Sequence, residues 1–344
     1  MKIEEQDWKF RIRYGGIRTI LSLILFTVVM NSPEAQLRPV IKNLVFEGAG
    51  IRGIAYCGSI MELESRQLMS AVEKVGGTSA GAIVALALSL GYTGGEIEKL
   101  ITGTNFRKFN DGRYFFVGGI HRTNKRFGWY RGRRFEKWLA KFIADKTGDA
   151  EITFEQLVAK GFRELYITGT CLNKQRLIVF SKVTYPHMKV KDAVRISMSI
   201  PLYFEAVFLD SLGNVVYRPK EVQGLDVMVD GGLLGNYPIG IFDSLPSKDP
   251  NTLGFRMDTD EQIGNDRERK GLAPMPINSL KDYMAAFYNI VLENINRQLL
   301  TDEDWRRTVS ISDGNIRPRI RRLSENEIRI LIENGRQAVK TYLN

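Results

Sequence analysis

Apolar and polar residues are distributed along the chain in patterns that predict a sheet covered by helices. Short apolar runs predict buried strands over residues 43–46, 164–170, 176–180 and 227–229. Helical spacing of apolar residues predicts helices over residues 54–68, 81–90, 134–144 and 279–300. A capping box at Ser324 starts a predicted closing helix that runs through Leu343. Strand, glycine turn and helix, repeated near the start, are typical of a doubly wound α/β sheet.

Two segments, 101–132 and 245–275, lack this periodicity and are richer in glycine, proline and charge. We expect them to be loops or mobile insertions over the functional site. The pattern therefore predicts one large α/β domain over residues 36–344, with a C-terminal helical extension at about 275–344.

The first 35 residues predict a secretory signal peptide. Basic residues precede an apolar run of eleven residues from Ile20 to Met30, and the small residues Ser32 and Ala35 follow it. The run is shorter than the roughly 20 residues of a membrane span. We expect an exported protein, periplasmic or secreted, that is soluble or peripheral. The alternatives are an uncleaved amphipathic anchor, which would make the protein membrane-associated, and a buried helix.

Two glycine motifs follow the first predicted strand. Gly48, Gly50 and Gly53 form GxGxxG, which offers backbone N–H groups at a helix start, where the helix dipole favours an anion. Gly77, Ser79 and Gly81 form GxSxG, which forces a strand into a helix through a tight turn that exposes the serine hydroxyl. Their order and spacing predict one site that combines an oxyanion-binding loop with a nucleophile.

A third motif lies far downstream, where the strand 227–229 runs into Asp230-Gly231-Gly232. With these three motifs the sequence resembles the patatin-like phospholipase family, whose GxGxxG, GxSxG and DGG/DGA signatures they match in order. The segment 193–204, small residues ending in proline and an aromatic, is similar to a family stretch too. Glu47 and Ala49 depart from the DGGGxRG form of the first motif, and we expect the Ala49 methyl to narrow the loop.

The resemblance implies a three-layer α/β/α patatin-like fold with a mostly parallel central sheet and a catalytic dyad of Ser79 and Asp230. Neither histidine, His121 or His187, follows Asp230, so the chain order of an α/β-hydrolase triad is absent. The resemblance, which spans about residues 43–245, also implies a lipid acyl hydrolase of phospholipase A or lysophospholipase type that works through an acyl-enzyme.

The oxyanion would be held by backbone N–H groups within Gly48, Ala49, Gly50, Ile51, Arg52 and Gly53. We expect Arg52 to position this loop through a carboxylate rather than to bind the substrate phosphate. The scheme needs no metal and no cofactor.

The net charge of +10 favours an anionic partner, and for a serine hydrolase a phospholipid surface fits better than nucleic acid. Basic and aromatic residues alternate at Arg122, Lys125, Arg126, Phe127, Trp129, Tyr130, Arg131, Arg133 and Arg134. We expect a membrane-facing lid there, against the alternative of an ordinary solvated helix face. The sequence leaves the oligomeric state open.

Two other functions remain as alternatives. GxGxxG after a strand also occurs in dinucleotide-binding oxidoreductases, and Glu73 lies at the spacing of a ribose-binding acid. GxSxG and DGG have no role in that scheme. The second alternative is a non-catalytic lipid-surface or interaction protein that keeps the patatin fold.

Overall fold

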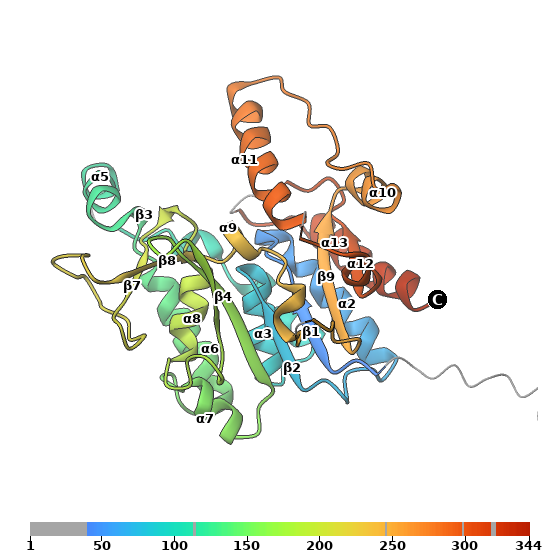
Figure 1. The fold of residues 1–344 in the computed structure, drawn as a ribbon, viewed down its shortest axis with the longest axis horizontal. Coiled ribbons are helices and arrows are strands. Elements are labelled where there is room, and N and C mark those ends of the chain that lie inside the picture. The colour runs from blue at the N-terminus through green and yellow to red at the C-terminus, as the bar shows by residue number, and fades with distance from the viewer. Residues whose placement is uncertain (1–39, 113–114, 245, 298, 318–320) are drawn as a thin grey trace, which may run out of the picture. The chain divides into compact units, whose positions relative to one another are not determined.

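A mixed sheet forms the centre of residues 41–344 (Figure 1). The computed structural model describes residues 40–344 except 113–114, 245, 298 and 318–320. The predicted signal peptide, residues 1–35, lies outside the described residues, so export stays a prediction. Among the described residues no helix is both long and apolar enough to span a bilayer.

Neighbouring strands in the main sheet follow the order β10, β9, β1, β2, β4, β8 and β7. Strand β5 pairs with residues 167–171 of β4. The strands are β1 (Asn43–Phe46), β2 (Lys74–Gly77), β4 (Glu164–Cys171), β5 (Arg176–Phe180), β7 (Val207–Leu209), β8 (Asp226–Asp230), β9 (Thr252–Asp258) and β10 (Thr308–Ser312). The five strands from β10 to β4 are parallel, whereas β5, β8 and β7 pair antiparallel. The predicted mostly parallel α/β/α fold is confirmed.

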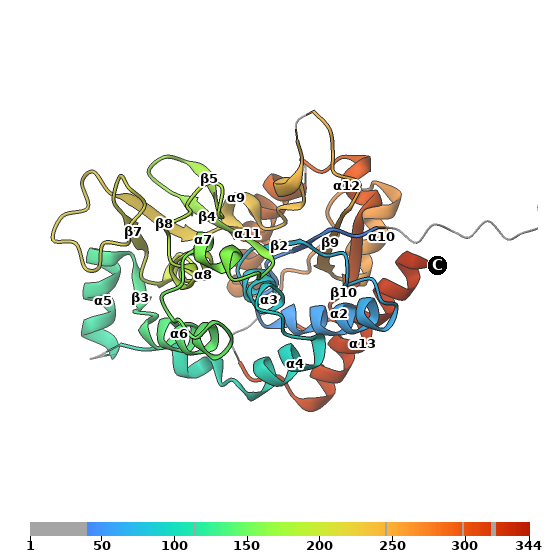
Figure 2. The same cartoon turned by 90° about the horizontal axis from the view of Figure 1, so that it is seen from below.

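Helices cover both faces of this sheet, and Figure 2 shows α2, α3 and α13 on one side and α9 on the other. The α-helices are α2 (Ala55–Ser65), α3 (Ala80–Ser89), α4 (Gly94–Gly103), α5 (Phe115–Arg126), α6 (Arg133–Thr147), α7 (Phe154–Ala159), α8 (Val190–Ser197), α9 (Gly232–Gly235), α10 (Asp260–Glu268), α11 (Leu280–Arg297), α12 (Asp302–Arg306) and α13 (Glu325–Leu343). Short 3₁₀ helices are η1 (Gly50–Ile54), η2 (Phe106–Phe109) and η3 (Ile239–Phe242). The predicted helices and strands are all present, with ends within three residues of expectation.

Strand β1 shows why both faces of the sheet are covered by other elements. Its side chains alternate, so Leu44 and Phe46 join the main core under α2 and α3. Val45 points the other way and packs with Tyr237 and Ile239 around η3. The strand is buried on both faces and ends at the glycine loop.

The expectation of loops over 245–275 was wrong. Residues 252–258 form β9, which lies between β1 and β10 inside the sheet. Gly254 and Arg256 interrupt its apolar run and hid the strand in the sequence pattern. Arg256 is fully buried, and its guanidinium is balanced by Asp258 at 2.9 Å and Glu293 at 2.7 Å.

The expectation of a loop over 101–132 was also wrong. This segment contains η2, α5 and strand β3 (Gly128–Tyr130), which pairs with β6 (Leu202–Phe204) in a small second sheet. Arg122 lies inside the structure, 4% exposed, and donates to the Trp129 carbonyl at 2.8 Å. It therefore does not belong to a basic surface, whereas Arg133 and Arg134 at the start of α6 are exposed.

Candidate active site

Ser79 occupies the turn between β2 and α3, with φ of 53° and ψ of −120°. A non-glycine residue is strained in this region, which is why such turns mark functional sites. The flanking glycines are required by space: a Cβ at Gly81 would lie 2.3 Å from the Phe46 carbonyl oxygen, and one at Gly77 would lie 2.6 Å from the backbone of Gly81. The turn is thus wedged against the end of β1.

The segment after α8 holds Ser79 in place. The Ser79 N–H donates to Ser197 Oγ at 2.9 Å, and the Ser79 hydroxyl donates to Met198 Sδ at 3.6 Å. The next carbonyl, that of Ser199, accepts the Asp230 N–H at 2.9 Å. The sequence marked this small-residue stretch by resemblance but gave these three residues no role, because only the fold brings them between the serine and the aspartate.

Asp230 lies at nearly the same height along β4 as the serine turn, but on the opposite side of that strand. Gly77 of β2 lies opposite Ile167 of β4, and Asp230 of β8 lies opposite Gly169. The chain just past Gly77 therefore meets Asp230 across the width of one strand. Strand β4 lies between the two motifs, and the antiparallel direction of β8 brings Asp230 to the edge of the sheet where β2 ends.

Two hydroxyls join the serine turn to the aspartate turn across β4. Thr78 Oγ1 shares a hydrogen bond of 2.6 Å with Thr168 Oγ1 and donates to the Gly235 carbonyl at 2.8 Å. A Cβ at Gly231 would lie 2.3 Å from Thr168 Oγ1, so this position excludes larger side chains. Gly77 to Gly81 and Asp230 to Gly232 thus form one packed unit.

Burial controls the charge of Asp230. Desolvation raises the pKa of its carboxyl to about 7, although the Gly232 N–H, which donates to Oδ1 at 2.8 Å, and the Ser79 hydroxyl both lower it. A carboxylate that titrates near neutrality is suited to accept a proton from a hydroxyl.

The Ser79 hydroxyl is near enough to Asp230 to lower the pKa of its carboxyl. In the described part of the chain its hydrogen bond goes to Met198 Sδ, a weak acceptor. Catalytic hydrogen bonds are often long in unliganded sites and tighten when substrate binds, so this arrangement is compatible with proton transfer from Ser79 to Asp230.

The glycine loop passes beside Ser79. Gly48 donates its N–H to the Asn236 carbonyl at 3.0 Å, and Gly50 has a positive φ of 56°. Gly50 and Ile51 open η1, so their N–H groups have no intrahelical acceptor, and both residues line the cavity at Ser79. The Arg52 N–H already donates to the Ala49 carbonyl at 3.3 Å. Gly53 contributes space, because a Cβ there would lie 3.1 Å from that of Ala80.

The two departures from the family motif are accommodated inside the protein. Ala49 is 2% exposed, its methyl packs in the main core, and it does not line the cavity at Ser79. Glu47 accepts the Met257 N–H at 2.9 Å and lies 3.5 Å from Arg256. Burial raises the pKa of Glu47, and the charge of Arg256 opposes this rise. Arg52 pairs with Asp313 at 2.8 Å, which is the positioning role expected for it.

Asn236 joins the loop to the aspartate turn and was not recognised in the sequence. Its side-chain amide donates to the Gly48 carbonyl at 3.0 Å and to Glu47 Oε1 at 3.3 Å. A Cβ at Gly48 would lie 2.3 Å from Asn236 Oδ1. Asn236 lies four residues after Gly232, directly after helix α9. Sequence spacing alone does not predict that this helix turns its side chain toward the glycine loop.

An apolar cavity of about 100 Å³ opens next to Ser79. Its lining includes Ile83, Phe106, Phe109, Met198 and Phe204, together with Ser79 and the loop residues Gly50 and Ile51. The walls suit a hydrocarbon chain, but the volume is below the roughly 300–1,000 Å³ of drug-sized ligand sites. A long chain would occupy it only after its aromatic walls move.

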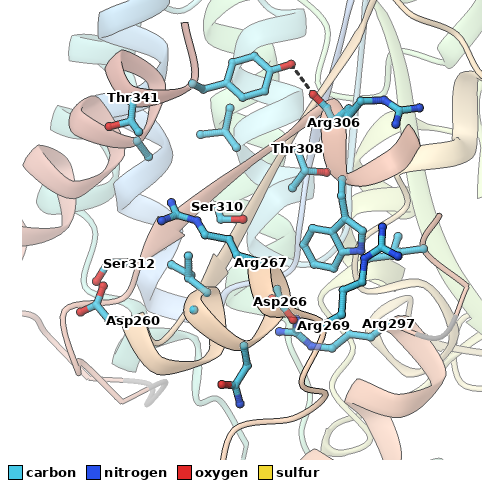
Figure 3. A pocket seen from close by; sticks show the side chains of 18 of the residues that line it. Asp260, Asp266, Arg267, Arg269, Arg297, Arg306, Thr308, Ser310, Ser312 and Thr341 are labelled. Carbon is cyan, nitrogen blue, oxygen red and sulfur yellow. Dashed lines mark hydrogen bonds and ion pairs between the residues drawn. The ribbon is translucent and has the colours of Figure 1, made fainter. Parts of the chain in front are cut away.

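A larger cavity of about 1140 Å³ lies elsewhere, between α10, α12, β10 and α13 (Figure 3). Figure 3 shows Arg267, Arg269 and Arg306 around it, but the ion pairs of Arg269 with Asp302 and of Arg306 with Glu303 balance two of these charges. Neither Ser79 nor Asp230 lines this cavity. Size alone therefore does not make it the reactive centre.

Neither histidine nor Glu73 lines the cavity at Ser79. His187 pairs with Glu155 at 3.4 Å on the surface, and His121 is exposed on α5. Glu73 pairs with Lys42 at the amino end of β2, away from the glycine loop that a dinucleotide would need it to face. Within the described residues no group of three or more His, Cys, Asp or Glu side chains is arranged for a metal ion.

Comparisons with known proteins agree with this geometry. A family model described as patatin-like phospholipase matches residues 44–243. YqhO of Bacillus subtilis is 33% identical over 209 residues, which cover 58% of this chain and 65% of that protein. "Probable lipid hydrolase 463L" of invertebrate iridescent virus 6 is 26% identical over 207 residues, covering 58% of this chain and 62% of its own length. The match thus spans less than two thirds of either relative.

The fold has a counterpart among solved structures. VipD from Legionella pneumophila superposes with a TM-score of 0.56 at 16% identity, covering 89% of this chain and 67% of that one. At this identity the likeness concerns the fold alone. Because the family match spans the glycine loop, the serine turn and the aspartate turn, the chain belongs to the patatin-like phospholipase family.

Proposed function

We propose that the chain is a serine acyl hydrolase that cleaves phospholipid, lysophospholipid or other lipid carboxylic esters through a Ser79–Asp230 dyad. The observation that carries this proposal is the buried carboxyl of Asp230, with a pKa of about 7, facing the strained serine turn beside an apolar cavity. The family match and the name of the viral relative support a lipid ester as the substrate.

The proposed reaction uses this chain's residues alone. Asp230 takes the Ser79 proton while Ser79 Oγ attacks the ester carbonyl, and the N–H groups of Gly50 and Ile51 donate to the oxyanion. The leaving alcohol takes the proton from Asp230, which leaves an acyl-serine and an ionised carboxylate. Water then gives a proton to Asp230 and attacks the acyl group. The fatty acid departs, and the proton returns to Ser79 Oγ.

Fatty-acid release tests this proposal. Purified wild type, Ser79→Ala and Asp230→Asn are compared on phospholipids, lysophospholipids and triacylglycerols without added calcium. We expect release by the wild type and loss of at least about 10³-fold in both variants. Full turnover by Ser79→Ala would refute the dyad. A folded wild type that releases nothing and does not react with a fluorophosphonate would favour a non-catalytic lipid-surface protein.

A dinucleotide-dependent oxidoreductase has less support, because Glu73 faces away from the glycine loop. Stabilisation of the protein by NAD or NADP would revive it.

The proposal includes a peripheral position at a membrane, with α5, β3 and the start of α6 as a lid over the cavity. Arg133 and Arg134 are exposed there and suit anionic headgroups. Charge reversal at these two positions should weaken vesicle binding, and unchanged binding would contradict the lid. Export through residues 1–35 belongs to the same proposal, and an unprocessed N-terminus on protein taken from its cells would contradict it.

A further inference from the structure

Helix α11 exposes an apolar stripe at the edge of the proposed site. Figure 1 shows α11 and α5 extending beyond the sheet at the end where the glycine loop and α9 lie. Leu280 is 78% exposed and Phe287 is 58% exposed. The exposed apolar residues follow one another at helical spacing: Leu280, Tyr283, Met284, Phe287, Ile290 and Val291. Met275 and Ile277 in the preceding loop extend the patch.

The opposite face of α11 is polar and points into the protein. Asn296 Oδ1 accepts the Asn236 N–H at 2.7 Å, and Glu293 pairs with the buried Arg256 at 2.7 Å. Arg297 pairs with Asp266 at 2.5 Å and also with Asp258. The helix therefore has the reverse polarity of a helix on a water-facing surface, where the apolar stripe packs on the core. Contiguous exposed apolar patches of this kind mark interaction sites.

The inward contacts connect α11 to the reactive residues. Asn236 also holds Gly48 of the glycine loop, and α11 packs against α9, which follows Asp230 directly. An object that binds the outer stripe is thus held at a fixed orientation to Ser79 and Asp230.

We propose that the outer face of α11, from Leu280 to Val291, is the surface by which the protein docks on an anionic lipid–water interface. The inference rests on the proposed function, because a lipid-cleaving site needs its substrate delivered from such an interface. At about 27 Å, the helix is long enough to lie in the interface plane with its apolar side immersed.

Charge complementarity selects the lipid surface over another occupant. Arg218 is exposed, and the charges of nearby Arg133, Arg126 and Arg131 lower its pKa, which indicates crowded positive charge. These arginines lie at the end of α5, around the start of α6 and in the loop before β8, and the whole chain carries a net charge of +10. In Figure 1 α5 and α11 are separate projections beyond the sheet. An anionic headgroup layer relieves this crowding while the apolar stripe enters the acyl region.

The test compares two double variants of the full chain. Leu280→Asp with Phe287→Asp alters the stripe. Val183→Asp with Leu212→Asp is the matched control, because these residues are 75% and 83% exposed but lie in loops outside α11. Binding to vesicles of phosphatidylglycerol and phosphatidylcholine is measured by sedimentation. Turnover of a water-soluble short-chain ester is measured in parallel.

We expect the α11 variant to bind vesicles at least about tenfold more weakly, with wild-type turnover of the soluble ester. The control variant should match the wild type in both assays, and pure phosphatidylcholine vesicles should bind all proteins more weakly. Vesicle binding that is equal in the α11 variant and the wild type would overturn the proposal.

Two further outcomes are distinguishable. If the wild type is a dimer that the α11 variant converts to a monomer, with vesicle binding unchanged, the stripe is a self-association surface and the proposal is wrong. If no protein cleaves any ester, the proposed function fails, but the binding comparison still decides the role of α11.

Discussion

The two residues of the proposed dyad are both held in states that an ordinary surface residue avoids. Ser79 has a positive φ, and Asp230 is a charged residue type that is only 6% exposed. Neither state follows from residue type, so the sequence predicted the pair through its motifs and could not predict the Asp230 pKa. The Met198 and Ser197 contacts were equally unpredictable, because they depend on where α8 ends.

The Asp230 pKa predicts how turnover depends on pH. Only the ionised carboxylate accepts the Ser79 proton, so kcat/KM should rise with pH and level off above about 7. Below this pKa it should fall about tenfold per pH unit. Rates on a soluble uncharged ester from pH 5 to 9 check the profile. A flat profile would show that Asp230 is not the base.

The same shift predicts a stability difference between the wild type and Asp230→Asn. The folded state holds the Asp230 proton up to a pH of about 7, whereas the unfolded state loses it near its ordinary pKa of 3.8. The protonated carboxyl thus contributes stability that is fully present below the unfolded pKa and is lost as pH rises through the folded pKa. Asparagine does not titrate, so the variant should gain stability relative to the wild type between pH 4 and 8.

Urea unfolding at each pH measures this difference, which reaches at most about 4 kcal/mol. Glu47, whose pKa is also raised by burial, contributes equally to both proteins and cancels. A difference that does not change with pH would contradict the raised pKa of Asp230.

At the scale of elements, apolar patterns predicted β1, β4, β5 and β8 and the helices α2, α3, α6, α11 and α13, whereas other elements, β9 and β10 among them, were not predicted. Strand β9 was missed because Arg256 looks like a surface residue until Glu47, Asp258 and Glu293 are assembled around it. Helix α11 was predicted within three residues of its bounds, but its orientation was not predictable. Its polar face is satisfied only by partners distant in sequence, such as Asn236.

Asn236 offers a test of how the elements position the oxyanion loop. Removing its amide in Asn236→Ala frees the Gly48 carbonyl and Glu47 from their shared donor. We expect kcat to fall by about 10- to 100-fold with little change in KM, because the loop matters most in the transition state. Asn214→Ala, in an exposed turn, is the control. A rise in KM with unchanged kcat would assign Asn236 to substrate binding instead.

At the scale of the whole molecule, the last helix, α13, packs against the helix that follows the glycine loop. Helix α13 packs on α2, the helix that follows η1, and Ser59 Oγ donates to the Gly335 carbonyl at 3.0 Å. The contact is close because both helices carry glycine there. A Cβ at Gly58 would lie 1.8 Å from the Ile332 carbonyl oxygen, and one at Gly335 would lie 2.0 Å from that of Ala55.

Gly335→Ala should therefore destabilise the entire fold. The methyl would collide with rigid backbone, so we expect a loss of about 1–3 kcal/mol in the free energy of unfolding. Gly103→Ala is the matched control in α4, where a Cβ meets nothing within 4 Å. That variant should be neutral or more stable by up to about 1 kcal/mol. Equal stability of both variants would show that α13 shifts freely on α2.

The reversed polarity of α11 also sets which substitutions this helix can bear. In most helices of soluble proteins an outward leucine exchanged for aspartate is harmless and an inward asparagine exchanged for leucine improves packing. Here the second exchange at Asn296 would remove the acceptor of the Asn236 N–H and loosen the glycine loop, although every hydrophobicity scale would favour it. The first exchange, at Leu280, should leave the fold intact and, under the proposed docking role of α11, weaken binding to the lipid surface. The inner side of α11 must therefore stay polar for the fold, and its outer side must stay apolar for the proposed docking.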